Sequence, residues 1–192
     1  MIEKIIEKIK ENIYVKQYCI VAIDGCGGSG KSTLAEFIVS KYGDGQIIHT
    51  DDFYKPSNQR SQLEMSKKEP GADYDLKRLK QDVILPIIIN MEAKYQRYDW
   101  VTDKLAEWHN VIPNGLIIIE GVYSISELLY TNYDIKIFVE CNKELRLKRG
   151  LERDGENALD FWEQWMIGEN KYLLEQNPRD RSDFIISGED EY

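Results

Sequence analysis

Residues 25–32 have the sequence Gly-Cys-Gly-Gly-Ser-Gly-Lys-Ser and directly follow the apolar run Tyr18–Ile23. This is a complete G-x-x-x-x-G-K-[ST] pattern between a predicted buried strand and a predicted helix over Lys31–Lys41. Glycines let several backbone N–H groups converge on a phosphate, and the N-terminus of the helix attracts the same anion. The pattern therefore predicts a loop that binds the phosphates of a nucleoside triphosphate. The residues expected to contact the nucleotide are Gly25, Gly27, Gly28, Ser29, Gly30, Lys31, Ser32 and Thr33.

Composition limits what the rest of the chain can be. Its 192 residues suit a single α/β domain over residues 1–192, and the formal net charge of −9 disfavours a general nucleic-acid binder. No apolar run approaches the roughly 20 residues of a membrane span, and charged residues interrupt the N-terminal segment. We therefore expect neither a membrane segment nor a signal peptide, and we predict a cytoplasmic protein.

The cysteines favour neither a disulfide framework nor a zinc site. Cys19, Cys26 and Cys141 are odd in number and widely spaced. Cys26 lies in the phosphate loop beside a helix N-terminus, which is expected to lower the pKa of its thiol. We interpret it as a variable position of the loop in preference to a redox residue.

Strand and helix patterns alternate along the chain, which is typical of a parallel sheet covered on both faces. The predicted strands are Tyr18–Ile23, Gln46–Thr50, Leu116–Glu120, Ile135–Glu140 and Phe184–Ser187. Helices are predicted over Lys31–Lys41, Asp75–Asn90, Ser124–Leu129, Lys143–Glu152 and Ala158–Glu175, and isoleucines 2, 5, 6, 9 and 13 predict an N-terminal helix that packs on the domain. The segment from Lys94 to Ile112 predicts an inserted hairpin. The expected fold is a three-layer α/β sandwich around a mainly parallel five-stranded sheet.

Two acidic positions follow predicted strands, where ligands of open α/β sheets bind. Asp51 follows the strand Gln46–Thr50, and it could act as a base on an acceptor hydroxyl or could cap a turn. Glu120 ends the strand Leu116–Glu120, and it could bind Mg²⁺ or could pair with a surface lysine. The local sequence leaves both pairs of alternatives open.

A basic segment follows the strand Ile135–Glu140. Arg146, Arg149 and Arg153 share one helical face, which suits either a lid over a phosphoryl group or a solvated surface. The nearby sequence Asn142-Lys143-Glu144-Leu145 has leucine where guanine recognition needs an aspartate, so a GTPase is disfavoured. The chain's two histidines, His49 and His109, are interpreted as packing or hydrogen-bonding residues.

Taken together, these segments resemble the uridine kinase and phosphoribulokinase family of P-loop kinases, most closely its uridine kinase branch. The matching pieces are Gly25–Ser32, Asp51-Asp52-Phe53-Tyr54, Asp73-Tyr74-Asp75, Tyr98-Asp99-Trp100, Glu120-Gly121, and Arg149 through Arg153-Asp154. The resemblance implies a single P-loop kinase domain with an acceptor-site insertion at about 53–112 and a lid at about 143–160. It also implies ATP and Mg²⁺ as cofactors.

The resemblance further implies a role for each matching residue. Asp51 would be the base, Lys31, Arg149 and Arg153 would act on the phosphates, and Ser32, Asp51 and Glu120 would place Mg²⁺. The positions expected around the acceptor are Tyr54, Tyr74, Asp75, Tyr98, Trp100 and Asp103.

Two departures from the family pattern concern the acceptor. Asp103 takes the place of a histidine that reads the base in pyrimidine-nucleoside kinases, and no arginines follow Arg153-Asp154. We therefore expect ATP-dependent phosphorylation of a small-molecule hydroxyl, with the 5′-hydroxyl of a nucleoside as the best candidate. Another sugar, polyol or vitamin-like alcohol, or a regulatory ATPase without an acceptor, remains an alternative. The expected partner is the small-molecule acceptor, with no nucleic acid or membrane, and a homo-oligomer is left open.

Overall fold

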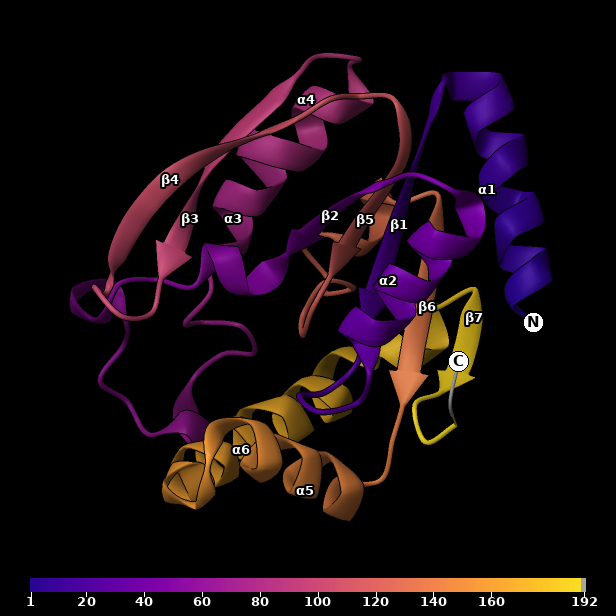
Figure 1. The fold of residues 1–192 in the computed structure, drawn as a ribbon. Helices are drawn as coiled ribbons and strands as arrows, with labels where there is room; N and C mark the ends of the chain where they lie inside the picture. Colours follow the sequence, from indigo (N-terminus) through magenta and orange to yellow (C-terminus); the bar gives the residue numbers. More distant parts are fainter. Residues whose placement is uncertain (191–192) are drawn as a thin grey trace.

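A five-stranded sheet forms the centre of the molecule in the computed structural model, which describes residues 1–190 (Figure 1). Its strand order is β2-β5-β1-β6-β7, and every neighbouring pair is parallel. The strands are β1 (Tyr18–Asp24), β2 (Gln46–His49), β5 (Gly115–Glu120), β6 (Ile135–Glu140) and β7 (Phe184–Ser187). Each of these five strands was predicted to within one residue at either end, so the expected fold class is confirmed.

The first face of the sheet is covered by α1 (Ile2–Lys16) and α2 (Lys31–Tyr42). Alternate side chains of a strand point to opposite faces, so Val21 of β1 joins this core while Ile20 joins the other one. Ile5 and Ile9 of α1 are fully buried in it, which confirms the predicted packing of the N-terminal isoleucines.

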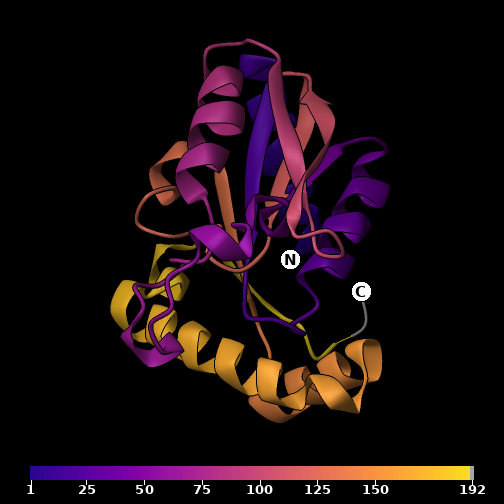
Figure 2. The same cartoon turned by 90° about the vertical axis from the view of Figure 1, so that its left-hand side faces the viewer.

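The second face is covered by a helical run and a hairpin. The run comprises α3 (Leu76–Arg78), a π-helical segment (Leu79–Ile84) and α4 (Leu85–Ile88), close to the single predicted helix Asp75–Asn90. The hairpin consists of β3 (Ala93–Asp99) and β4 (Lys104–Val111), which pair in antiparallel fashion as a separate two-stranded sheet. The figures show that the hairpin lies beside α3 and α4, away from α1 (Figures 1 and 2).

The last two helices lie beyond the carboxyl ends of the strands. They are α5 (Lys143–Asp154) and α6 (Leu159–Gln176), and Figures 1 and 2 show them side by side across that end of the sheet. Both were predicted to within two residues. Within residues 1–190, no helix is long and apolar enough to cross a membrane.

The helix predicted over Ser124–Leu129 is wrong. The segment instead forms successive turns, in which Ser126 N–H donates to Tyr123 and Leu129 N–H donates to Ser126. The N–H of Ile125 donates to Oδ2 of Asp24 at 2.7 Å, and Tyr123 adopts a φ of 70°. The Asp24 carboxylate, which is distant in sequence, holds the backbone of this segment in a non-helical conformation. The apolar residues of the segment are therefore buried without helical periodicity.

Candidate functional site

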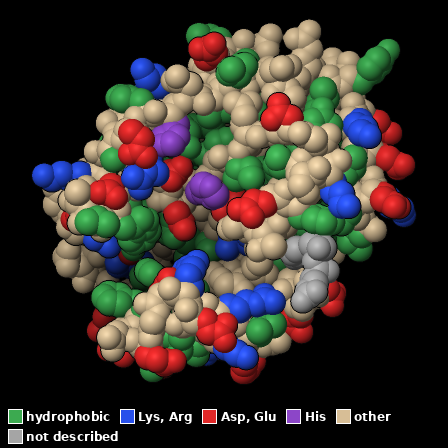
Figure 3. Space-filling model, in the orientation of Figure 1, with side chains coloured by type: hydrophobic (Ala, Val, Ile, Leu, Met, Phe, Trp, Pro, Cys, Tyr) green, Lys and Arg blue, Asp and Glu red, His purple; other side chains and the backbone are tan. Residues whose placement is uncertain are grey.

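A cavity of about 670 Å³ opens at the carboxyl ends of the strands, between the sheet and the α5–α6 pair. The phosphate loop and the residues after β2 and β5 line its first half. The segment 65–74, Tyr54, Trp100 and α6 line the other half. In Figure 3 a groove separates the body of the molecule from α5 and α6, and Lys and Arg side chains gather along it. The motifs predicted at strand ends are thereby brought into one site.

The phosphate loop is folded as a cradle. Lys31 is the first residue of α2, is 8% exposed, and donates from Nζ to the carbonyl of Cys26 at 3.2 Å. Gly28 adopts a φ of 76°, and a Cβ there would lie 2.4 Å from the Arg146 carbonyl oxygen. Only glycine permits this backbone path, and the path leaves the loop free to curve around an anion.

Cys26 does not have the activated thiol that its place beside the helix suggested. It is buried, and burial together with the charge of Glu169 raises its pKa to about 12. The expected lowering of this pKa is not borne out, because burial disfavours the charged thiolate.

Glu120 and Ser32 meet beside the loop. The Ser32 hydroxyl donates to Oε1 of Glu120 at 3.0 Å, and Nδ1 of His49 lies 2.5 Å from the same oxygen. Burial alone would raise the pKa of Glu120, but the hydrogen bond from His49 and the charge of Lys31 lower it. The hydrogen bond with Glu120 in turn raises the pKa of His49. Glu120 is thus held as a carboxylate, and His49 is a hydrogen-bonding residue as predicted.

Asp51 lies at the junction of the two halves of the cavity. It belongs to a short 3-10 turn (Thr50–Phe53) after β2, and its Oδ1 accepts a hydrogen bond from the Tyr74 hydroxyl at 3.3 Å. The side chain is reachable by solvent through the cavity, yet the cavity walls surround it. Burial raises the pKa of Asp51, the charge of Glu120 adds to this rise, and Lys31 and Tyr74 oppose it.

Aromatic side chains form a continuous wall in the second half of the cavity. Trp100 stacks on Tyr54 with ring centroids 4.4 Å apart, and Tyr74 meets Tyr54 edge-on at 4.9 Å. Two rings that were not anticipated complete the wall. Trp165 of α6 meets Trp100 edge-on at 6.5 Å, and Tyr123 lies 5.2 Å from Tyr74. Their sequence neighbourhoods gave no signal, because α6 and the turn after β5 reach the cavity only through the tertiary fold.

Three of the residues expected around the acceptor do not line the cavity, namely Asp75, Tyr98 and Asp103. Asp75 caps α3 by accepting the Arg78 N–H at 3.1 Å. Asp103, in the turn between β3 and β4, accepts hydrogen bonds from the Tyr98 hydroxyl at 2.6 Å and from the Ser57 N–H at 2.9 Å. Asp73 and Lys68 line the cavity in their place and form a buried ion pair.

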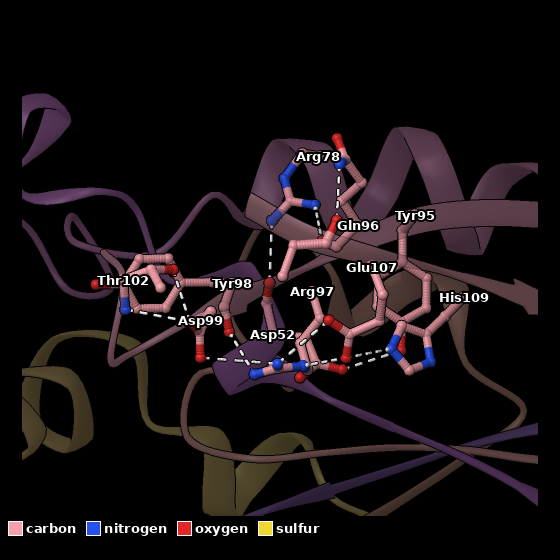
Figure 4. Close-up of polar contacts among 11 residues, drawn as sticks. Asp52, Arg78, Tyr95, Gln96, Arg97, Tyr98, Asp99, Thr102, Glu107 and His109 are labelled. Atoms are coloured by element: carbon pink, nitrogen blue, oxygen red, sulfur yellow. Dashed lines mark hydrogen bonds and ion pairs between the residues drawn. The ribbon is translucent and has the colours of Figure 1, made fainter. Parts of the chain in front are cut away.

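Polar contacts fix the hairpin against the segment that follows β2 (Figure 4). Arg78 donates to the Gln96 carbonyl at 2.8 Å and to the Asp52 carbonyl at 3.1 Å, and the Tyr95 hydroxyl donates to the Asp52 carboxylate at 3.0 Å. His109 stacks on Tyr95 with a centroid distance of 5.3 Å, which agrees with its predicted packing role. These bonds hold Trp100, at the end of the hairpin, over the cavity.

The three arginines of α5 divide into two groups. Arg149 and Arg153 line the cavity, and Arg149 donates to the carbonyls of Gly188 at 2.7 Å and Gly28 at 3.4 Å. Arg146 was expected on the same helical face, but it is buried in an ion pair with Glu169 at 2.8 Å. The helical spacing is correct, yet α6 covers the first turns of α5.

Two buried carboxylates behind the loop were not anticipated from the sequence. Asp24 accepts hydrogen bonds from the N–H groups of Gly25 and Ile125 and from the Tyr172 hydroxyl, at 2.6–2.7 Å. Burial raises its pKa to about 6. Glu169 accepts the Gly27 N–H at 2.7 Å. Only Gly25 among these partners is close in sequence, so no local motif indicated either role.

Comparison with known proteins gives consistent matches. Residues 20–158 match the model of the phosphoribulokinase / uridine kinase family. The chain is 25% identical over 196 residues to nicotinamide riboside kinase from Saccharomyces cerevisiae, covering 91% of this chain and 82% of that protein. It is 32% identical over 160 residues to uridine kinase from Mycoplasma genitalium, covering 76% and 73% respectively.

Solved structures share the fold. The "Possible Uridine Kinase" from Bacillus stearothermophilus superposes with a TM-score of 0.70 at 18% identity, covering 95% of this chain and 99% of that one. D-glycerate 3-kinase from Cryptococcus neoformans superposes with a TM-score of 0.69 at 13% identity, covering 100% and 97%. The chain therefore belongs to the phosphoribulokinase / uridine kinase family and is a phosphotransferase that acts on a hydroxyl group.

Proposed function

We propose that this kinase transfers the γ-phosphoryl group of ATP to a hydroxyl of a nucleoside-type small molecule, with the 5′-hydroxyl as the acceptor. The main support is that one cavity contains a phosphate loop in its first half and an aromatic wall in its second, with Asp51 at the junction. Phosphoryl transfer requires such an in-line arrangement of donor, base and acceptor.

The first half of the cavity suits ATP and Mg²⁺. The loop cradle at Gly28 and the ammonium of Lys31 would hold the β- and γ-phosphates. The oxygen atoms of Ser32, Glu120 and Asp51 are the hard donors that Mg²⁺ prefers. Phosphate oxygens and water would complete the coordination of the ion. Bound Mg²⁺ neutralises charge on the phosphates.

Asp51 is the proposed general base. Its raised pKa strengthens the carboxylate as a proton acceptor, and the hydrogen bond from Tyr74 orients it. In this proposal an acceptor hydroxyl lies between Asp51 and the phosphate loop and gives its proton to the Asp51 carboxylate. Arg149 and Arg153, which line the cavity, are proposed to stabilise the charge on the transferred group.

The aromatic wall supports an acceptor with a flat ring. Tyr54, Trp100 and Trp165 offer π-faces and edges to stack against, and stacking is tolerant of the identity of the ring. A nucleoside presents such a ring together with a hydroxyl.

A second candidate is another sugar, polyol or vitamin-like alcohol. It is favoured by the position of Asp103, which is engaged by Tyr98 and Ser57 outside the cavity. A base-reading contact at this position is therefore not supported. A regulatory ATPase without an acceptor is disfavoured, because an aromatic acceptor wall would then have no use.

The test is a coupled ADP-release assay over a panel of nucleosides, sugars and polyols. We expect the largest stimulation from nucleosides. Stimulation by sugars or polyols alone would support the second candidate, and no stimulation by any acceptor would contradict the kinase proposal. Lys31→Met is the control, because ADP release that persists in this variant would come from a contaminating ATPase.

A further inference from the structure

Helix α6 contacts both halves of the cavity. Trp162, Trp165 and Glu169 line the cavity from a single face of the helix, since they are three and seven residues apart. Trp165 belongs to the aromatic wall through its edge-on contact with Trp100. Glu169 and Trp162 contact the phosphate loop instead. One rigid element thus joins the nucleotide end of the site to the acceptor end.

The contact with the phosphate loop is centred on Gly27. Oε1 of Glu169 accepts the Gly27 N–H at 2.7 Å. A Cβ placed on Gly27 would lie 3.0 Å from the Trp162 ring and 3.1 Å from Oε1 of Glu169. The backbone of the loop at Gly27 therefore packs directly against two side chains of α6.

The carboxylate of Glu169 is oriented by a second partner. Its Oε2 accepts a hydrogen bond from Nη1 of Arg146 at 2.8 Å, and both side chains are 6% exposed. The Arg146 carbonyl oxygen also borders Gly28, at the next position of the loop. A buried ion pair adds little net stability compared with apolar residues of the same volume. Its value here lies in orientation, because each oxygen of Glu169 has one fixed donor.

We propose that Glu169 is a positioning residue that couples the phosphate loop to the acceptor wall. By holding the Gly27 N–H, it sets the direction of the loop amides that follow. Phosphate binding to those amides acts on Glu169 and Trp162 and so displaces the α6 face that includes Trp165. Coupling of this kind is reciprocal, so the acceptor wall in turn affects nucleotide affinity. This inference rests on ATP as the donor in the proposed function and is independent of the acceptor's identity.

The test uses the tryptophans of α6 as reporters. The chain has four tryptophans, and replacing Trp108, which lies outside the cavity lining, by phenylalanine leaves Trp162 and Trp165 of α6 together with Trp100, which contacts Trp165. This parent variant is titrated with the magnesium complex of the non-hydrolysable ATP analogue adenylyl imidodiphosphate. Calorimetry gives the dissociation constant, and tryptophan emission reports the environment of α6. We expect a saturable change in emission with the same dissociation constant as calorimetry.

Three variants in that background separate positioning from a structural role. The double variant Arg146→Leu/Glu169→Leu removes the hydrogen bond to Gly27 without leaving a buried unpaired charge. We expect it to bind the analogue about tenfold more weakly or worse and to lose the emission change. Glu169→Gln keeps an oxygen acceptor for the Gly27 N–H, so its affinity should stay within about threefold and its emission change should persist. Glu163→Gln, at an exposed position of the same helix, should match the parent.

The contradicting outcomes are distinct. A double variant that melts at the parent's temperature, binds with the parent's affinity and keeps the emission change would overturn the proposal. Analogue binding to the parent without any emission change would also overturn it, even if the double variant does not fold. Absence of calorimetric binding to the parent would overturn the assignment of ATP as donor, and this proposal with it.

Discussion

The Ser32 hydroxyl and the Glu120 carboxylate are 3.0 Å apart although 88 residues separate them in the chain. Ser32 is in the first turn of α2 and Glu120 is the last residue of β5. The parallel pairing of β1 with β5 brings Ile23 level with Glu120 just before the phosphate loop begins. The sheet register therefore creates the oxygen pair that the proposed function assigns to Mg²⁺.

Replacing Glu120 by glutamine should weaken the binding of Mg²⁺ and leave ATP binding in place. An amide keeps the hydrogen bond from Ser32 but loses the negative charge that attracts the cation. We expect the Mg²⁺ concentration for half-maximal activity to rise roughly tenfold. The measurement is the initial rate against free Mg²⁺ at saturating ATP. Glu144→Gln, an exposed acid of α5, is the matched control, and an equal shift in both variants would contradict the assignment.

Asp51→Asn should lower kcat by a factor of about 100 or more and leave the dissociation constant for ATP nearly unchanged. Asp52→Asn is the adjacent control, since the Asp52 carboxylate accepts from Tyr95 and does not line the cavity. That control should lose stability and keep most of its kcat. A near-normal kcat in Asp51→Asn would remove Asp51 from the role of base.

The pH profile gives a second check on Asp51. A base must be deprotonated, and burial raises the pKa of Asp51 above its ordinary value. We therefore expect kcat/KM to fall on the acid side as Asp51 becomes protonated. The residual activity of Asp51→Asn should lack this acid limb. An unchanged limb in the variant would assign it to another group.

Trp100→Ala should raise the KM for the acceptor about tenfold and leave the KM for ATP unchanged. Trp100 stacks on Tyr54 in the acceptor half, and its removal opens the aromatic wall. Trp108→Ala, on the same hairpin and outside the cavity lining, is the matched control. Steady-state kinetics with each substrate varied in turn distinguish the two effects. An equal rise in both KM values would show that the hairpin acts on the whole site instead of on the acceptor.

Asp24 should make the protein less stable as the pH rises toward neutrality. Burial raises its pKa in the folded state to about 6, so the folded protein binds a proton at Asp24 more tightly than the unfolded chain does. This contribution is largest below the unfolded pKa of about 3.9 and is lost as pH rises through about 6, a change of about 3 kcal/mol. Urea unfolding of the wild type and Asp24→Asn at several pH values measures it as the difference between the two proteins. A difference that does not vary between pH 4 and pH 7 would contradict it, and Asp160→Asn serves as the control for an exposed aspartate.

The sequence was sufficient where local patterns set the structure. Short apolar runs such as Ile135–Glu140 fixed the strands, and the Gly25–Ser32 motif located the nucleotide end of the site. The order of the motifs also predicted that Asp51 and Glu120 lie near the phosphate loop, and both line the same cavity. They do so because each lies at the end of a strand or directly after one, and the carboxyl ends of these strands share one edge of the sheet.

The sequence was insufficient where a distant partner decides the conformation. The turns over Ser124–Leu129 depend on Asp24, and the burial of Arg146 depends on Glu169 in the next helix. Trp165 reaches the acceptor wall only because α6 crosses the carboxyl ends of the strands. Periodicity and motif spacing contain none of these long-range pairings.

The most direct test of the proposed phosphoryl transfer is mass spectrometry of the acceptor that best stimulates ADP release. After incubation with ATP and Mg²⁺, the wild-type protein should yield an acceptor with one added phosphoryl group, in amounts equal to the ADP formed. Asp51→Asn should yield almost none over the same time. ADP and free phosphate beside an unmodified acceptor would contradict the account, because water would then be the phosphoryl acceptor.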